Sequence, residues 1–542
     1  MYATPRAGTP AIFQCPYTLH MQTSRRHFIK TAGTGLAGIG FLPLLRPIHQ
    51  LWDTTADNRF PRSRPELQGV SPADILRFVE AANTSGISWH SFMLLRHGHV
   101  VAEGWWHPFS SEKVHSLYSL SKSFTSTAIG MLVKEGKLDI NTPVISFFPK
   151  EVPDQPSDNL KKMTVKHLLT MNTGHAADTL PFMQRTDSSW IAVFLAQPVT
   201  FTPGTHFLYN TGATYMLGAI LHAVTGQILQ DYLAPRLFEP LGIKGYDWET
   251  SPEGLNVAGW GLRVKTEDIA KLGQLYLQQG QWKGKELLTS SWVKEATGYQ
   301  TSSQEGNGDW SQGYGYQFWR CTHGAFRGDG AFGQYCIVMP DKDAVLAITS
   351  QTDDMQQSLN LVWKYLLPAI QDHPLPADTT AYNALQNALG QLELPVVKGN
   401  TSNPLAARYH RLNWTPAPND FGATAMQFDF TDRGCTWTTQ TVAGTTTLRF
   451  GWEKWVINKD RQTYRFPEAG LNHKPTQVAG TATWINDHTL QLNMRFVETF
   501  HGDTITCTFD DNKLSISFLD SITAAGSKKD SRKVLTAAII QL

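Results

Sequence analysis

Three serine–lysine pairs with two residues between them could each place a nucleophilic hydroxyl beside an amine. They are Ser110–Lys113, Ser119–Lys122 and Ser291–Lys294. A serine hydroxyl attacks a carbonyl carbon efficiently only when a base takes its proton. Lysine has an ordinary pKa of about 10.4, so burial or a neighbouring cation must lower that pKa before the amine can act near neutrality. Average residue usage predicts roughly one or two such pairs by chance in a chain of this length, so the surroundings must decide between them.

The second pair is distinguished by the helix that follows it. Ser110 lies in a polar segment, and Ser291 precedes a charged segment where a helix cap is typical. Residues 120–136 repeat apolar side chains at intervals of three and four, which predicts a helix that begins beside Ser119. Residues three apart share a helix face, so we expect the Lys122 amine to reach the Ser119 hydroxyl. The N–H groups at the start of a helix also favour a developing oxyanion.

The elements that would position this pair form a mixed α+β region, which we assign to residues 68–375. A hairpin is predicted around His97-Gly98, within residues 90–106. Further strands are predicted at 314–320 and 334–350. The helices that we predict in this region and just beyond it span residues 71–84, 163–172, 211–225, 266–280, 355–371 and 379–391. The last of these helices would lie in a linker of residues 376–405, which follows the breaks at Pro374 and Pro376.

From residue 406 the pattern of apolar and polar residues changes. Short segments such as ATAMQFDF, TTTLRFGW and KLSISFLD alternate apolar and polar residues and are separated by turn residues. This pattern predicts a small all-β domain, a barrel or a sandwich, over residues 406–542. Two interpretations stay open, a lipocalin-like cup for a ligand and a packing or docking module. We favour the second, because no group of residues in this domain forms a recognisable catalytic or binding motif.

The amino-terminal residues resemble an export signal. Residues 24–30 read SRRHFIK, and the Gly/Ala-rich apolar stretch TAGTGLAGIGFLPLL follows. The paired Arg25 and Arg26 make this segment similar to a twin-arginine signal, which implies export to the periplasm or another extracytoplasmic compartment. The alternative is a short amphipathic helix with a basic start. We assign residues 1–50 to this leader and 51–67 to a linker.

Composition and failed motifs exclude several classes of protein. The formal net charge of the 542 residues is +1, which gives no reason to expect a nucleic-acid partner. Beyond the leader no apolar run reaches 18 residues, so no transmembrane helix is expected. Five cysteines cannot form a disulfide framework, although the pairs Cys321–Cys336 and Cys435–Cys507 stay open alongside free thiols. Neither G-x-G-x-x-G match has the setting of a dinucleotide site, and no metal motif occurs, so no cofactor is expected.

Several segments together resemble the β-lactamase-related serine hydrolases, the superfamily of class C β-lactamases, D,D-peptidases and related esterases and amidases. The segments are YSLSKSFTSTAIGMLVKEGKLDINTPV at 118–144, MTVKHLLTMNTG at 163–174, PGTHFLYNTGATYMLGAILHAVTGQ at 203–227, GWGLRVKTEDIAKLGQLYLQQG at 259–280 and GDGAFGQYCIVMPDKDAVLAIT at 328–349. The resemblance implies a β-lactamase/transpeptidase-like domain, in which helices flank an antiparallel sheet.

The resemblance also implies roles for individual residues. Ser119 matches the nucleophile, Lys122 the lysine that shares its proton, and Tyr209 the tyrosine that passes a proton toward the leaving group. Backbone N–H groups of Ser119 and Ala331 match the two donors of the oxyanion hole. Which of Lys122 and Tyr209 is the base stays open, because two interacting groups titrate as a pair. The implied route is a covalent acyl-enzyme that water then hydrolyses.

Two departures from the family pattern bear on the substrate. The tyrosine motif reads Tyr209-Asn210-Thr211, with threonine where the family has asparagine. The third motif reads Gly328-Asp329-Gly330, without the cation that commonly holds a substrate carboxylate; Arg327 or His323 is an alternative source of that charge. Candidate pocket residues are Asn210, Thr211, Arg327, Asp329 and Gly330.

The sequence therefore predicts an exported serine hydrolase that cleaves an ester or amide bond in a small-molecule or peptide-like substrate. The alternatives are a β-lactamase or D,D-peptidase, and a penicillin-recognising or ligand-binding protein that does not turn over. Ester turnover with little cephalosporin hydrolysis is expected.

Overall fold

The computed structural model describes residues 58–539, apart from 186–188, 463–473 and 526–528. These residues belong to one compact unit that runs from Ala56 to Leu542. The twin-arginine pair and the rest of the predicted leader lie outside the described residues. Within the described ranges, none of the helices combines the length and the apolar character that crossing a bilayer requires.

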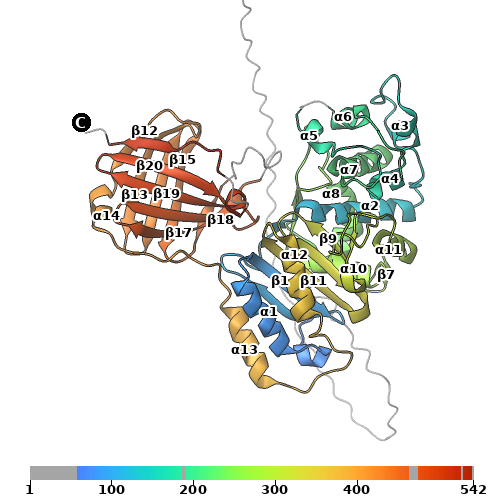
Figure 1. Ribbon diagram of the computed structural model, residues 1–542, viewed down its shortest axis with the longest axis horizontal. Helices are drawn as coiled ribbons and strands as arrows, with labels where there is room; N and C mark the ends of the chain where they lie inside the picture. The colour runs from blue at the N-terminus through green and yellow to red at the C-terminus, as the bar shows by residue number, and fades with distance from the viewer. Residues whose placement is uncertain (1–57, 186–188, 463–473, 526–528, 540–542) are drawn as a thin grey trace, which may run out of the picture. The chain divides into compact units, whose positions relative to one another are not determined.

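An antiparallel sheet forms the middle layer of the first domain (Figure 1). Its strand order is β2-β1-β11-β10-β9-β8. Along β1 the side chains alternate between two cores, since Phe92 and Leu94 pack into one and Met93 and Leu95 into the other. Both faces of the sheet are therefore covered. The strands are β1 (Ser88–Arg96), β2 (His99–Trp105), β8 (Trp319–Arg320), β9 (Phe326–Gly330), β10 (Gln334–Met339) and β11 (Ala344–Gln351).

Helices lie on both faces of this sheet (Figure 1). One core contains side chains of α1 (Pro72–Thr84), α12 (Met355–Leu361) and α13 (Thr379–Gly390). The opposite core contains α2 (Ser121–Lys134) and α10 (Thr266–Leu277). Helix α1 begins where the sequence indicates, because the Ser71 side chain accepts a hydrogen bond from the backbone N–H of Asp74 at 3.2 Å.

A helical region completes the core beside α2, and short strands border it. Its helices are α3 (Asp158–Lys162), α4 (Val165–Leu169), α5 (Leu180–Met183), α6 (Trp190–Ala196), α7 (Thr211–Thr225), α8 (Leu229–Leu233), α9 (Glu239–Leu241) and α11 (Ser290–Thr297). The strands are β3 (His115–Ser116), β4 (Asp247–Trp248), β5 (Leu262–Val264), β6 (Gln281–Trp282) and β7 (Lys285–Glu286). The predicted helix at 211–225 is confirmed, whereas the predicted strand at 314–320 is reduced to β8.

The second domain is the closed barrel that the alternating segments predict. Strand β15 pairs in parallel with β17 and closes the ten-stranded sheet among the described residues. The strands are β12 (Asn413–Pro416), β13 (Ala423–Thr431), β14 (Gly434–Thr441), β15 (Gly444–Trp452), β16 (Val456–Gln462), β17 (Thr476–Asn486), β18 (Thr489–Phe496), β19 (Gly502–Asp510), β20 (Lys513–Asp520) and β21 (Leu535–Ala538). Helices α14 (Pro404–Tyr409) and α15 (Ser521–Ala525) flank it.

Large side chains fill the inside of this barrel. Trp414, Phe428, Trp484 and Phe509 are all buried in one apolar cluster. A barrel of this size holds a small ligand only when its interior is left open. The packed interior favours the packing or docking interpretation over the ligand cup.

The four cysteines of the described residues are free and buried. They are Cys321, Cys336, Cys435 and Cys507. Neither of the two pairings that the sequence left open is formed.

Candidate active site

The nucleophile candidate and its amine lie at the junction of a short turn and a long helix. Ser119 is in the single 3₁₀ turn Tyr118–Leu120, which leads directly into α2. Lys122 is in the first turn of α2, and its Nζ donates a hydrogen bond to the Ser119 Oγ at 3.2 Å. Ser119 stays partly accessible, whereas Lys122 is 1% exposed. A buried amine thus faces a hydroxyl that a substrate can reach.

Burial of Lys122 favours the neutral form of its amine. Its Nζ also donates to the Gly259 carbonyl oxygen at 2.8 Å and to the Thr211 Oγ1 at 3.4 Å. Burial lowers the pKa of Lys122 to about 7, although the carboxylates of Asp178 and Asp329 oppose that shift. The amine is therefore able to accept a proton near neutral pH.

The Tyr209 phenol borders the same hydroxyl. The Ser119 side chain interacts with the Tyr209 phenol, and the Tyr209 ring lies 5.0 Å from the Lys122 Nζ, measured to the ring centroid. The ring stacks on Trp319 with centroids 5.6 Å apart. Burial raises the pKa of Tyr209 well above its ordinary value, and the nearby Asp329 carboxylate raises it further. The phenol stays protonated near neutral pH and can donate a proton.

Strand β9 approaches the nucleophile turn closely because it is rich in glycine. A Cβ on Gly330 would lie 2.0 Å from the Leu117 carbonyl oxygen, so only glycine fits there. A Cβ on Gly328 would lie 2.4 Å from the Ser123 Oγ. Gly330 thus brings the N–H of Ala331, which follows it, next to the turn that carries Ser119. The same close packing explains why no larger side chain stands at Gly328.

Of the two residues after Tyr209, the threonine faces the site and the asparagine does not. Thr211 lines the cavity beside Ser119 and contacts the Lys122 amine. The Asn210 side chain is buried and accepts hydrogen bonds from the Thr179 N–H at 3.1 Å and from its hydroxyl at 2.8 Å. Asn210 as a pocket residue is therefore corrected, because its amide is turned toward the protein interior.

The interpretation of Arg327 as a substrate-facing cation is also corrected. Arg327 is 0% exposed and does not line the cavity beside Ser119. Its Nε donates to the Asp329 Oδ2 at 3.0 Å, and its guanidinium lies 4.3 Å from the ring centroid of Trp310. The alternative source of charge, His323, lines a different cavity with Trp363. Neither residue stands where it could hold a substrate carboxylate beside Ser119.

The cavity beside Ser119 has a volume of about 380 Å³, and both domains line it. The first domain supplies Ser119, Thr211 and Trp260, and the barrel supplies Thr499 and His501, among others. No motif in the sequence marks these barrel residues as part of a site.

Asp178 is another residue of the site that no sequence motif singles out. Its carboxylate accepts hydrogen bonds from the N–H groups of Leu180 and Thr211, at 3.0 and 2.9 Å. The only sequence signal for it is its position just after the MTVKHLLTMNTG segment.

A flanked antiparallel sheet with a serine–lysine pair at the start of a buried helix defines the class of β-lactamase-related serine hydrolases. The family model described as Beta-lactamase matches residues 75–369, which is more than half of the chain. The chain belongs to this family.

Comparisons with individual proteins give more distant likenesses. The chain is 26% identical over 294 residues to a 6-aminohexanoate-dimer hydrolase of Paenarthrobacter ureafaciens, covering 49% of this chain and 73% of that protein. It is 23% identical over 230 residues to a Beta-lactamase of Escherichia coli (strain K12), covering 39% of this chain and 58% of that protein. An octameric penicillin-binding protein homologue from Pyrococcus abyssi matches with a TM-score of 0.45 and 16% identity, over 85% of this chain and 99% of that one.

Proposed function

We propose that the chain hydrolyses an ester or amide bond through an acyl intermediate on Ser119. The observation that carries the proposal is the 3.2 Å approach of the Lys122 Nζ to the Ser119 Oγ. It is supported by the burial of that amine, which lowers its pKa to about 7. A small-molecule or peptide-like substrate fits a site of this kind.

The assignment of the base follows from the two pKa shifts. Lys122 has a lowered pKa and is largely neutral just above pH 7, whereas Tyr209 has a raised pKa and stays protonated. Lys122 therefore takes the proton of Ser119 as the Oγ attacks the substrate carbonyl carbon. The C=O π bond opens, and the oxyanion that forms accepts hydrogen bonds from the N–H groups of Ser119 and Ala331.

Collapse of this intermediate breaks the bond to the leaving group. Tyr209 gives its proton to the departing oxygen or nitrogen and takes in return the proton that Lys122 accepted from Ser119, since the Lys122 ammonium lies beside the Tyr209 ring. Water then attacks the acyl-enzyme, with the same groups in reversed roles, and releases the acid and free Ser119. No proton is gained or lost by the site over the whole cycle.

A β-lactamase or D,D-peptidase is the second candidate, supported by the family and its relatives. Such substrates carry a carboxylate, and the cation that commonly holds it is replaced here by Gly328, while Arg327 is paired with Asp329. Neutral esters and amides are therefore preferred in this proposal. A protein that acylates without turnover is the third candidate.

One experiment separates these candidates. The purified chain and its Ser119→Ala variant are given p-nitrophenyl esters of increasing acyl length, the matching anilides and a chromogenic cephalosporin. Turnover of esters or anilides that Ser119→Ala abolishes and Ser110→Ala retains supports the proposal. Preferred cephalosporin hydrolysis favours the second candidate, and a stable adduct without turnover favours the third.

We also propose that Arg25 and Arg26 direct export, on the likeness of SRRHFIK to a twin-arginine signal. Replacing both arginines by lysine should retain the protein inside the cytoplasm of a host with a twin-arginine pathway. Unchanged export of that variant would remove the proposal.

A further inference from the structure

The turn between β18 and β19 is buried, although it is the tip of a hairpin. Its five residues, Val497, Glu498, Thr499, Phe500 and His501, are at most 7% exposed. Connecting turns ordinarily run over the protein surface. Val497 instead belongs to an apolar core of the first domain, together with side chains of β1 and α1. The tip 497–501 is thus inserted into the hydrolase domain.

The two residues beside the proposed oxyanion donors have a left-handed backbone. Tyr118 precedes Ser119 and has a φ of 49°, and Phe332 follows Ala331 and has a φ of 66°. Side chains other than glycine seldom adopt this conformation, and they keep it only where their surroundings hold them. The position of both donors therefore depends on what packs against Tyr118 and Phe332.

One ring of the barrel packs against both of these residues. The centroid of Phe500 lies 4.6 Å from that of Tyr118 and 4.5 Å from that of Phe332. The rings of Tyr118 and Phe332 also contact each other edge to face, with centroids 6.3 Å apart. Phe500 thus joins the two chain segments that carry the amides.

Polar contacts hold the same tip against the nucleophile segment. The Tyr118 hydroxyl and the His501 Nε2 form a hydrogen bond of 2.8 Å. The Ser116 N–H donates to the Glu498 carbonyl oxygen at 2.9 Å, and the Glu498 carboxylate lies 3.4 Å from the Arg263 guanidinium. These contacts come from two segments of the first domain, residues 116–118 and strand β5, and fix the tip in one register.

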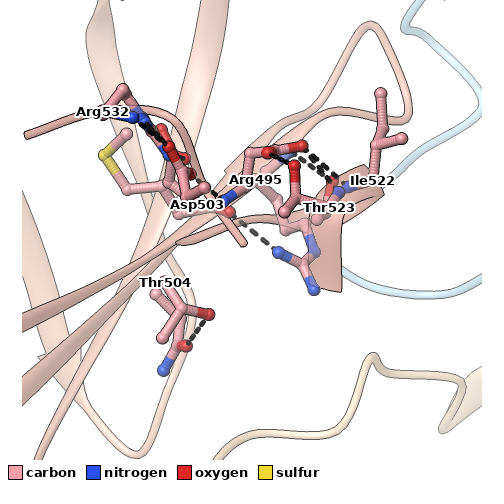
Figure 2. A network of polar contacts seen from close by, with 12 residues as sticks. Arg495, Asp503, Thr504, Ile522, Thr523 and Arg532 are labelled. Atoms are coloured by element: carbon pink, nitrogen blue, oxygen red, sulfur yellow. Dashed lines mark hydrogen bonds and ion pairs between the residues drawn. The ribbon is translucent and has the colours of Figure 1, made fainter. Parts of the chain in front are cut away.

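The barrel in turn anchors the strand that follows the tip. The Gly502 N–H donates to the Ser521 Oγ at 3.0 Å. Figure 2 shows the next residue, Asp503, which accepts a hydrogen bond from the Arg532 guanidinium at 2.6 Å. Arg532 also pairs with Asp530 at 2.6 Å. The barrel therefore holds the strand that directly follows Phe500 and His501.

We infer that the barrel is a working part of the active site, and that Phe500 and His501 are positioning residues for its oxyanion hole. Through Tyr118 and Phe332 they align the N–H groups of Ser119 and Ala331 on the substrate carbonyl oxygen. This inference rests on the proposed function. It gives the second domain a role in turnover that a packed interior alone does not explain.

The test uses the full chain with Phe500→Leu, measured on the best ester substrate. An oxyanion donor acts mainly in the transition state, so its misalignment lowers kcat and leaves KM nearly unchanged. We expect kcat to fall by roughly 10–100-fold, less than the 10²–10³-fold that follows the removal of one donor. The matched control is Phe509→Leu, the same change in the barrel core away from the tip, which should leave kcat within about threefold of the wild type.

A second pair of variants keeps the test decisive if Phe500→Leu does not fold. His501→Leu and Tyr118→Phe each remove the hydrogen bond between tip and turn, and each should lower kcat by about fivefold. The double variant should fall no further than the worse single one, because both remove the same contact. Unchanged kcat in Phe500→Leu or in both single variants, or an equal fall in Phe509→Leu, overturns the inference. A wild type that turns over no substrate overturns the proposed function instead.

Discussion

At the scale of single residues, the decisive feature is the buried amine of Lys122. Burial lowers the pKa of Lys122 by more than the carboxylates of Asp178 and Asp329 raise it, so the pKa falls to about 7. The Thr211 hydroxyl and the Gly259 carbonyl oxygen orient that amine toward Ser119. A general base works best when its pKa lies near the operating pH, and Lys122 meets this condition.

The rate should therefore depend on the protonation of Lys122. Because its pKa is lowered to about 7, the neutral base is scarce below that pH and predominates above it. We predict that kcat/KM rises about tenfold per pH unit up to about pH 7 and then levels off, as measured with a neutral ester. Lys122→Arg stays protonated and should lose roughly 10²–10⁴-fold in rate. A rising limb centred near pH 10 would contradict the assignment of Lys122 as the base.

At the scale of elements, the site depends on how closely β9 meets the turn before α2. The space between the Gly330 Cα and the Leu117 carbonyl oxygen admits no side chain. The same packing places Gly328 against α2. The strand can thus lie this close to the turn that carries Ser119 only while position 330 is glycine.

Gly330→Ala should accordingly damage the site more than the fold. Its Cβ would meet the Leu117 oxygen at 2.0 Å, so β9 must move away from the turn. We predict a loss of about 100-fold in kcat and a cost of ~1–3 kcal/mol in the free energy of unfolding, measured by ester kinetics and urea denaturation. Gly390→Ala at the end of α13 is the control and should change neither quantity appreciably, because an added Cβ there would meet no neighbouring element within 4 Å among the described residues. Full activity in Gly330→Ala would contradict this account of β9.

Features that depend on residues close together in the sequence could be predicted from it. Features that depend on tertiary packing between distant segments could not. The helix after Ser119 follows from apolar periodicity, and the Lys122 contact follows from the helix. Asn210 was misassigned because a motif gives the order of residues but not which one faces the cavity. Arg327 was misassigned because burial against Trp310 depends on tertiary packing. No motif or periodicity within residues 497–501 predicts that this turn inserts into the hydrolase domain.

At the scale of the whole molecule, the barrel shares a core with the hydrolase domain. Trp455 is buried among side chains of the first domain, and its Nε1 donates to the Leu394 carbonyl oxygen at 3.2 Å. Ala479 and Val497 of the barrel belong to the same core. A shared apolar core couples the unfolding of the parts that build it.

Calorimetry should therefore show one cooperative unfolding transition in the wild type. In Trp455→Ala the transition should be less cooperative. Removing a buried tryptophan costs about 3–5 kcal/mol, and here the cost falls on the contact between the domains. We predict that the transition of the variant splits or broadens. Trp437→Ala, which removes a tryptophan packed against the barrel core only, should shift a single transition downward. Two separate transitions in the wild type would show that the domains are independent.

The central claim is that Ser119 becomes covalently acylated because Lys122 takes its proton. The most direct measurement is labelling with a fluorophosphonate, followed by intact mass and peptide mapping, on the wild type, Ser119→Ala and Lys122→Ala. The account predicts one adduct that maps to Ser119, none in Ser119→Ala, and labelling slowed by roughly 10²–10⁴-fold in Lys122→Ala. An adduct on another residue, or labelling of Lys122→Ala at the wild-type rate, would contradict it.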